Sequence, residues 1–129
     1  MLPPGFAAPV FNLTPVQLSD AHNQRGFANV RLQNNKKALV DFEQAIKLDD
    51  QNVAAYKNRG ETFLAEADYP SAIEDFNRAL ALQKEDVAAL VQRGQAFSAQ
   101  TDMAKALSDF NQALKLDPAS DQALSLIHI

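Results

Sequence analysis

Residues 53–86 read VAAYKNRGETFLAEADYPSAIEDFNRALALQKED, and this stretch decides the fold because a copy lies on each side of it. Aligned on the dipeptide Arg-Gly, the copies span residues 19–52 and 87–120, which gives a repeat of 34 residues. Eight of the 34 positions are identical in all three copies, among them the glycine of the dipeptide. A fixed period of this length is typical of repeat proteins, in which each unit is one supersecondary structure.

Each copy has the apolar spacing of two helices. In the central copy, apolar and small residues follow helical spacing over residues 53–67, and a second apolar stripe covers residues 70–82. Asn52, Asp68 and Asp86 stand just before helical segments, and such side chains favour helix N-termini. The sequence therefore predicts an all-α fold built from helical hairpins.

The glycine of each unit falls in the middle of its expected first helix, where Gly costs about 0.8–1 kcal/mol relative to Ala. A glycine at this place in all three units indicates a close approach between the two helices of the hairpin. In the central unit we expect Gly60 to face Ala72, with the ring of Phe76 filling the space behind them. The other two units carry the same three residue types at the same positions.

Gly at position 8 of the unit, Ala at 20, Phe at 24 and Ala at 27 resemble the tetratricopeptide repeat, and the resemblance covers residues 19–120. It implies a solenoid of stacked helical hairpins, an α-α superhelix with a concave groove. The sequence departs from the family pattern at several places. Only Tyr56 supplies the aromatic residue of position 4, and the usual glycine between the two helices is replaced by Gln33, Ala67 and Thr101.

By the same resemblance, the first helices line the groove, and a peptide or helix of a partner protein would bind there. Four of the expected groove residues are apolar, which predicts binding through apolar contacts with modest help from charge. The candidate partner-binding residues are Asn23, Phe27, Val30, Lys57, Asn58, Glu61, Leu64, Val91 and Gln95.

One subclass of the family holds the C-terminal carboxylate of heat-shock chaperones with Lys, Arg and Asn side chains in the groove. The corresponding positions here are occupied by Asn23, Phe27, Asn58, Ala88 and Gln92, of which only Asn58 fits the subclass. Because the three cations are missing, the resemblance does not extend to this carboxylate clamp.

An arginine at position 7 and an aspartate at position 23 recur in every unit. They predict ion pairs either within a unit, such as Arg59 with Asp75, or between units, such as Asp41 with Arg59. An arginine column that binds an anionic partner is the functional alternative. The recurring opposite charge favours structural pairs, which set register more than stability because partly exposed pairs contribute about 0–1 kcal/mol.

Composition and charge argue against several classes of function. A net charge of −4 with a pI near 5.0 argues against binding of nucleic-acid phosphates, which needs clustered Lys and Arg. The sequence has no Cys, only two His (His22 and His128), and no motif for a cofactor, a metal ion or a catalytic centre. We therefore expect no enzymatic activity, no cofactor and no metal site, and we interpret His22, at the aromatic position, as a packing residue. No apolar run approaches the length of a membrane span.

The ends of the chain differ from the repeats. Residues 1–18 are rich in proline and are expected to be irregular, although residues 14–17 form a capping-box pattern that predicts a first helix beginning near Pro15. The array of three units and the start of a fourth spans residues 19–123. Residues 124–129 resemble the translation of an adaptor used in sequencing libraries, which indicates a non-native or truncated tail; a native apolar capping tail is the alternative.

These observations favour a non-catalytic protein–protein interaction module that binds a protein or peptide of unknown identity in the groove. Two alternatives stay open. One is a self-assembling structural scaffold, with self-association through an uncapped C-terminal unit, and the other is a helical accessory part of a larger protein. The first basic residue is Arg25, so no secretory signal pattern is visible; the cytoplasm is favoured, and a missing upstream signal would change that expectation.

Overall fold

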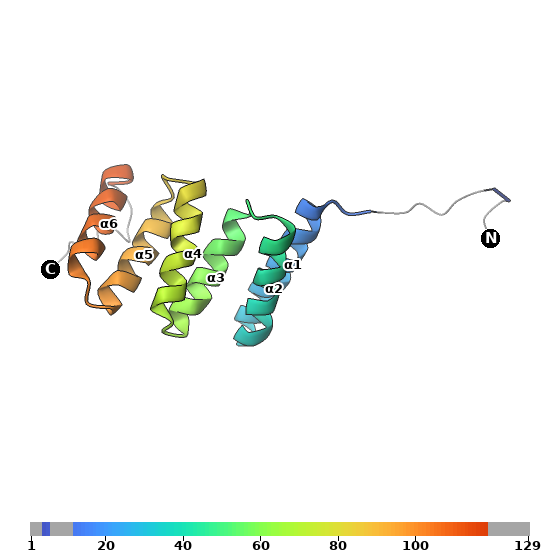
Figure 1. Ribbon diagram of the computed structural model, residues 1–129, viewed down its shortest axis with the longest axis horizontal. Coiled ribbons are helices and arrows are strands. Elements are labelled where there is room, and N and C mark those ends of the chain that lie inside the picture. Colours follow the sequence, from blue (N-terminus) through green and yellow to red (C-terminus); the bar gives the residue numbers. More distant parts are fainter. Residues whose placement is uncertain (1–3, 6–11, 119–129) are drawn as a thin grey trace.

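The computed structural model describes residues 4–5 and 12–118. The expectations for the tail, for His128, for the start of a fourth unit and for most of the N-terminal segment lie outside these residues. Within the described part the chain forms six α-helices and no strands, as the sequence predicts. They are α1 (Pro15–Arg31), α2 (Asn35–Leu48), α3 (Val53–Ala65), α4 (Tyr69–Leu82), α5 (Val87–Ala99) and α6 (Met103–Leu116). The hairpins follow one another in a row, in the order of the chain (Figure 1).

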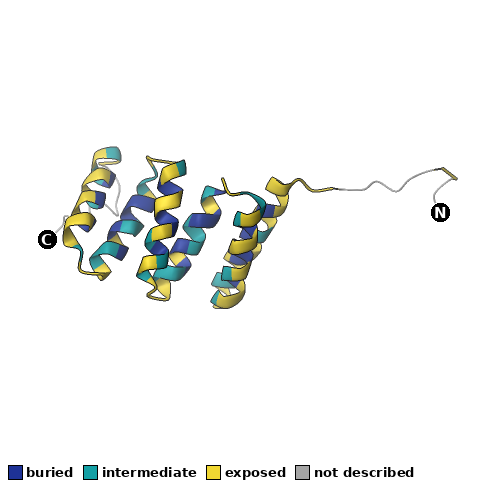
Figure 2. Cartoon of the chain, in the orientation of Figure 1, coloured by how far each residue is buried: buried dark blue, intermediate teal, exposed yellow. Residues whose placement is uncertain are grey.

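The helices pack as three hairpins. The most extensive contacts join α1 to α2, α3 to α4 and α5 to α6, and the hairpins are connected by contacts of α2 with α3 and of α4 with α5. The first helices also touch one another, α1 with α3 and α3 with α5. Buried residues recur every three or four positions along the helices, so each helix buries one side (Figure 2). This is the stacked-hairpin solenoid that the repeat predicts.

Every helix is preceded by an N-cap residue whose side chain accepts a hydrogen bond from a backbone N–H of the first turn. The predicted N-caps Asn52, Asp68 and Asp86 are confirmed, and they accept these bonds at 3.1, 3.3 and 3.0 Å. The predicted capping box before α1 is also present, with Thr14 as the N-cap. Because the caps satisfy backbone donors that a helix leaves unpaired, they fix where each helix starts.

The two helices of each hairpin meet where a glycine faces a phenylalanine ring. A Cβ atom added at Gly26, Gly60 or Gly94 would lie 2.6, 2.9 or 2.6 Å from the ring at position 24 of its own unit. The predicted close approach is therefore confirmed, but the predicted partner is wrong, since the side chain nearest to Gly60 is Phe76 and not Ala72. The flat ring occupies the volume that is free because glycine has no Cβ atom.

The turn between the two helices of each hairpin contains a residue with a left-handed backbone. Gln33, Ala67 and Thr101 have φ angles of 60°, 60° and 63°. These are the residues that stand where the family pattern has glycine. A left-handed backbone costs an L-residue roughly 1–2 kcal/mol, and a β-branched residue such as Thr101 adopts it rarely.

Replacing Thr101 with glycine is expected to stabilise the protein by about 1 kcal/mol, because glycine adopts this backbone without a Cβ penalty. A thermal melt followed by circular dichroism should show a raised Tm. Gln100→Gly is the control: Gln100 has a φ of −85°, so the substitution relieves no strain there and the Tm should fall. Equal shifts in the two variants would contradict strain at Thr101.

Candidate partner-binding groove

The first helices of neighbouring units form one surface, and a cavity of about 250 Å³ opens between α1 and α3. Four of the candidate groove residues line it, namely Phe27, Val30, Asn58 and Glu61. The other lining residues are Asn35, Phe42, Thr62 and Ala65. The structure therefore brings together four of the seven candidates that unit 1 (residues 19–52) and unit 2 (residues 53–86) supply.

The cavity has an apolar wall. Phe27 is 47% exposed although it is a large aromatic residue, and Val30 is half-buried. The hydroxyl of Thr62 is already satisfied, because it donates to the backbone carbonyl of Asn58 at 2.8 Å. A wall of this kind can hold an apolar side chain, whose burial contributes about 25 cal/mol per Å².

The polar groove residues pair with one another between units. Nδ2 of Asn58 donates to Oδ1 of Asn23 at 2.9 Å, and Nε2 of Gln92 donates to Oε1 of Glu61. Asn23 is buried, so the structure corrects the expectation that it meets a partner. Its side chain instead ties α1 to α3, because a buried amide needs a hydrogen-bond partner.

Val91 is a second correction. It is 1% exposed and belongs to an apolar cluster with Leu80, Ala89, Leu90 and Ala113. The cluster joins α4, α5 and α6. Its apolar neighbours on the adjacent helices take Val91 into the core, so this residue does not present a surface to a partner.

The remaining three candidates lie outside the cavity. Leu64 is half-buried and Gln95 is exposed. Nζ of Lys57 lies 2.8 Å from Oδ2 of Asp86, the N-cap of α5. This ion pair ties α3 to the start of α5 and neutralises the cation expected in the groove. Sequence reasoning assigned Asp86 its capping role and missed that the same carboxylate has a second partner.

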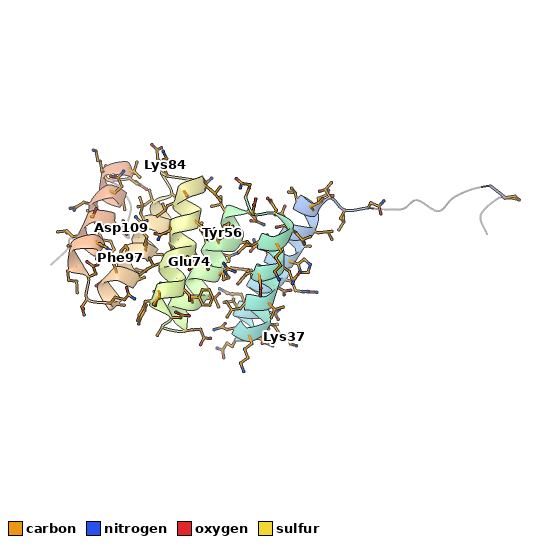
Figure 3. All side chains as sticks on the ribbon, viewed as in Figure 1. Lys37, Tyr56, Glu74, Lys84, Phe97 and Asp109 are labelled. Atoms are coloured by element: carbon orange, nitrogen blue, oxygen red, sulfur yellow. The ribbon has the colours of Figure 1, made fainter. Side chains whose placement is uncertain are left out.

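The three arginine–aspartate pairs form within the units. Nη2 of the arginine lies 2.7 Å from Oδ1 of the aspartate in Arg25–Asp41, Arg59–Asp75 and Arg93–Asp109. Nε of Arg59 also donates to Oδ2 of Asp75 at 2.8 Å, which makes the pair bidentate. The guanidinium of Arg93, the partner of Asp109, also lies 5.8 Å from the centre of the Phe97 ring; Figure 3 labels Asp109 and Phe97. Pairing within units is therefore confirmed, and in residues 12–118 no bond joins Asp41 to Arg59 or Asp75 to Arg93.

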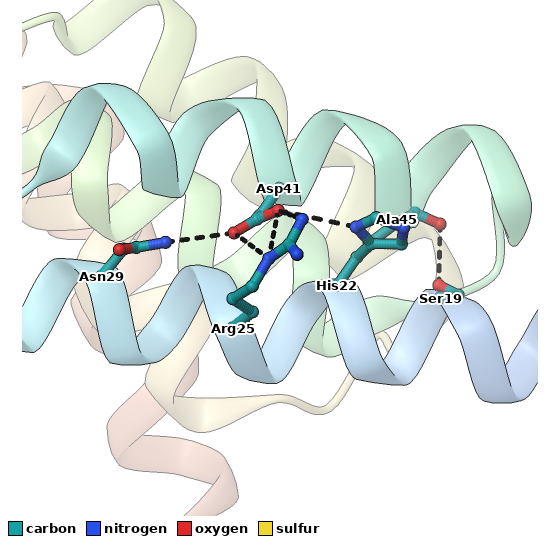
Figure 4. A network of polar contacts seen from close by, with 6 residues as sticks. All are labelled: Ser19, His22, Arg25, Asn29, Asp41 and Ala45. Atoms are coloured by element: carbon teal, nitrogen blue, oxygen red, sulfur yellow. Dashed lines mark hydrogen bonds and ion pairs between the residues drawn. The ribbon is translucent and has the colours of Figure 1, made fainter.

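Unit 1 adds further partners to its aspartate (Figure 4). Nδ2 of Asn29 donates to Oδ2 of Asp41 at 3.1 Å, and Nδ1 of His22 lies 3.5 Å from Oδ1 of Asp41. Beside them, the hydroxyl of Ser19 donates to the backbone carbonyl of Ala45 at 2.7 Å. His22 therefore contributes a polar contact to the ion pair and is not only the packing residue that its position predicts.

The aspartates of units 1 and 2 differ in pKa because their surroundings differ. The hydrogen bond from Arg25 holds the pKa of Asp41 below its ordinary value and outweighs the effect of burial, with a further contribution from His22. At Asp75, burial raises the pKa, and the hydrogen bond from Arg59 opposes that rise. Unit 2 lies between two units, which removes more water from its pair than from the pair in unit 1.

Replacing Asp41 with asparagine is expected to make the free energy of unfolding depend less on pH below neutrality. Because the folded-state pKa of Asp41 lies below the ordinary 3.8, its contribution is present above that value and is lost as the pH falls through the folded pKa. Urea midpoints should therefore fall at pH 7, and the loss between pH 7 and acid pH should be smaller in Asp41→Asn than in the unchanged chain. Parallel pH curves for the two proteins would contradict the assignment.

The described residues contain neither a candidate metal site nor a membrane-spanning helix. Among them, no group of three or more His, Asp or Glu side chains is placed to hold a metal ion. None of the described helices has the length and apolar character needed to cross a membrane. The cavity between α1 and α3 is the candidate site.

The comparisons with known proteins agree with this geometry. The family model of the tetratricopeptide repeat matches residues 24–86 and 60–121. No curated protein matches the sequence significantly. Among solved structures, the tetratricopeptide repeat domain of Arabidopsis OM64 is similar, with 29% identity, a TM-score of 0.82, and coverage of 86% of this chain and 92% of that chain.

Two further structures share the fold. The first tetratricopeptide repeat domain of Spaghetti (RPAP3), bound to the HSP90 peptide SRMEEVD, has 21% identity and a TM-score of 0.84 and covers 88% of this chain and 90% of that chain. YrrB, described as having an unusual peptide-binding site, has 21% identity and a TM-score of 0.80 and covers 86% of this chain and 57% of that chain. Both similarities concern the arrangement of the helical hairpins.

Proposed function

Since the chain belongs to the tetratricopeptide repeat family, which is in general a non-catalytic protein-interaction fold, we propose that it binds a peptide or helix of a partner protein in its groove. One observation carries the proposal: the cavity between α1 and α3 has an exposed aromatic residue, Phe27, in its wall. An exposed large apolar side chain beside a cavity marks a surface that gains free energy when it is covered.

The chemistry of the groove favours a partner segment anchored by an apolar side chain. Spaghetti (RPAP3) binds the acidic peptide SRMEEVD, but here only Asn58 fits the carboxylate clamp. Lys57 is already paired with Asp86, and Glu61 in the cavity wall would repel a carboxylate. We therefore propose an uncharged or basic segment with one apolar anchor for the cavity between α1 and α3.

The proposal is tested with peptides selected from a random library on the full chain and measured by calorimetry. Phe27→Asp should weaken the selected peptide at least about tenfold, which corresponds to 1.4 kcal/mol, because it removes the apolar wall. Leu64→Asp tests whether the binding surface extends along α3 beyond the cavity. Leu32→Asp is the matched control, since Leu32 is an exposed apolar residue of α1's C-cap that does not line the cavity.

Affinity should also persist in added salt, because screening weakens exposed charge pairs more than apolar burial. The peptide SRMEEVD serves as the acidic comparison and should bind more weakly than the selected peptide. If Phe27→Asp binds as the unchanged chain does, or if SRMEEVD binds best and is lost on adding salt, the apolar-anchor assignment is wrong.

A further inference from the structure

The two ends of the row of hairpins resemble the two halves of a contact that is made inside the chain. Internally, the second helix of one unit covers the first helix of the next, α2 over α3 and α4 over α5. Ala55 and Ala89, at position 3 of their units, are fully buried there. Ala21 occupies the same position on α1, at one end of the row (Figure 1), and it is exposed. Within residues 12–118, α1 has no preceding helix to cover it.

The arginine column shows the same difference. The side chains of Arg59 and Arg93 are 22% and 23% exposed, whereas that of Arg25 is 67% exposed. Nη1 of Arg93 donates to Oδ1 of Asn77 on α4 at 2.9 Å, so this guanidinium bonds to the preceding second helix. Arg25 binds Asp41 in the same way as the others, and a cavity of about 520 Å³ lies beside this pair, between α1 and α2.

Within residues 12–118, α6 forms the other end of the row and shows the complementary surface. Leu107 is 60% exposed, whereas its counterparts Leu39 and Ile73 are half-buried in units that are followed by another unit. Phe110 is half-buried, whereas the equivalent rings of units 1 and 2 are fully buried. On α6, Leu107 lies seven residues before Leu114 and therefore on the same side of the helix.

The residues that make the internal contact recur at both ends. Leu80 of α4 packs in one cluster with Ala89 and Leu90 of α5. On α6, Leu114 and Asn111 occupy the repeat positions that Leu80 and Asn77 hold on α4. On α1, Ala21 and Arg25 occupy the repeat positions that Ala89 and Arg93 hold on α5.

We propose that a second copy of this chain docks its α6 on α1 and thereby repeats the contact of α4 with α5. Asn111 of the second copy would accept a hydrogen bond from Arg25, as Asn77 does from Arg93, and Leu114 of the second copy would cover Ala21. The two surfaces differ, so the contact is heterologous, and each added copy leaves one surface of each kind free. Association is therefore head-to-tail and open-ended.

A second copy fits this place because the chain itself supplies the complementary helix. An alanine at position 3 leaves room for a leucine side chain of the covering helix. An arginine at position 7 can donate to a hydrogen-bond acceptor that lies three residues before that leucine. α6 carries this asparagine–leucine pair at the spacing found in α4. The proposal is independent of the groove, because Ala21 and Leu107 do not line the cavity between α1 and α3.

The test is sedimentation equilibrium of the full chain at concentrations from about 10 µM to 1 mM, the range of weak association. The average mass should rise above the monomer mass of 14.1 kDa with increasing concentration and should not stop at the dimer. Ala21→Glu blocks one surface and Leu107→Glu the other, and each variant alone should stay monomeric. Both sites are exposed helical positions and Glu is a good helix former, so the melting curves should show intact folding.

Mixing the two variants gives the decisive result. Each keeps the surface that the other has lost, so the mixture should form a one-to-one dimer that does not grow, while the double variant should stay monomeric in every mixture. If the unchanged chain is monomeric at 1 mM, the proposal is overturned, and a different chain or a further part of a longer protein covers these surfaces. Association that persists in either single variant, or a mixture without dimers, overturns it as well.

Discussion

Replacing Gly60 with leucine is expected to destabilise the protein by about 1–3 kcal/mol, because the side chain would have to enter space that an aromatic ring fills. The first added atom, Cβ, would already lie 2.9 Å from Cε1 of Phe76. Phe76 is fully buried in the central unit, so its ring can make room only by displacing the atoms packed around it. The better helix propensity of leucine offsets at most about 1 kcal/mol of this cost.

The measurement is a urea titration followed by circular dichroism, repeated in a Phe76→Leu background. If the ring is the obstacle, Gly60→Leu should cost less in that background, and the two substitutions should show a favourable interaction energy. Gly94→Leu extends the comparison. It should cost less stability than Gly60→Leu, because Phe110 is only half-buried and can move outward. An unchanged midpoint, or the same cost in both backgrounds, would contradict the close-approach argument.

The helices and their starts follow from local sequence. A cap acts on the backbone three residues away, so Asn52, Asp68 and Asp86 could be assigned without knowing what packs around them. The contact of Gly60 could not be assigned in this way. The repeat places both Ala72 and Phe76 on the facing helix, and only the direction of the ring decides which of them meets the glycine.

The candidate groove residues that the sequence places together and that share one cavity all lie where units 1 and 2 meet. A repeat position assigns a residue to a face of its helix, but burial depends on neighbours in other units. Lys57 and Val91 hold the same position, yet the lysine pairs with an N-cap and the valine enters an apolar cluster. The left-handed backbone did have a signal in the sequence: Gln33, Ala67 and Thr101 stand where the family pattern has glycine.

The pair Arg59–Asp75 is expected to show a coupling energy of about 1.5–3 kcal/mol in a double-mutant cycle, the range of hydrogen bonds to charged groups. The side chain of Asp75 is only 3% exposed, and two hydrogen bonds of 2.7 and 2.8 Å join it to Arg59. Asp75→Ala would leave a half-buried guanidinium unpaired, and breaking a fully buried pair costs roughly 3–5 kcal/mol. Because Arg59 keeps part of its surface in water, we expect the lower end of that range.

The matched control is the same cycle on Arg25 and Asp41, where the arginine is largely exposed and solvent screening leaves a smaller coupling. A third cycle on Asp41 with Arg59 should be additive, because these residues belong to different pairs. Equal coupling in the first two cycles would show that burial by the neighbouring units does not strengthen the central pair. If the effects of Arg59→Ala and Asp75→Ala are additive, the pair has no structural role. The arginine column would then be the better candidate for binding an anionic partner.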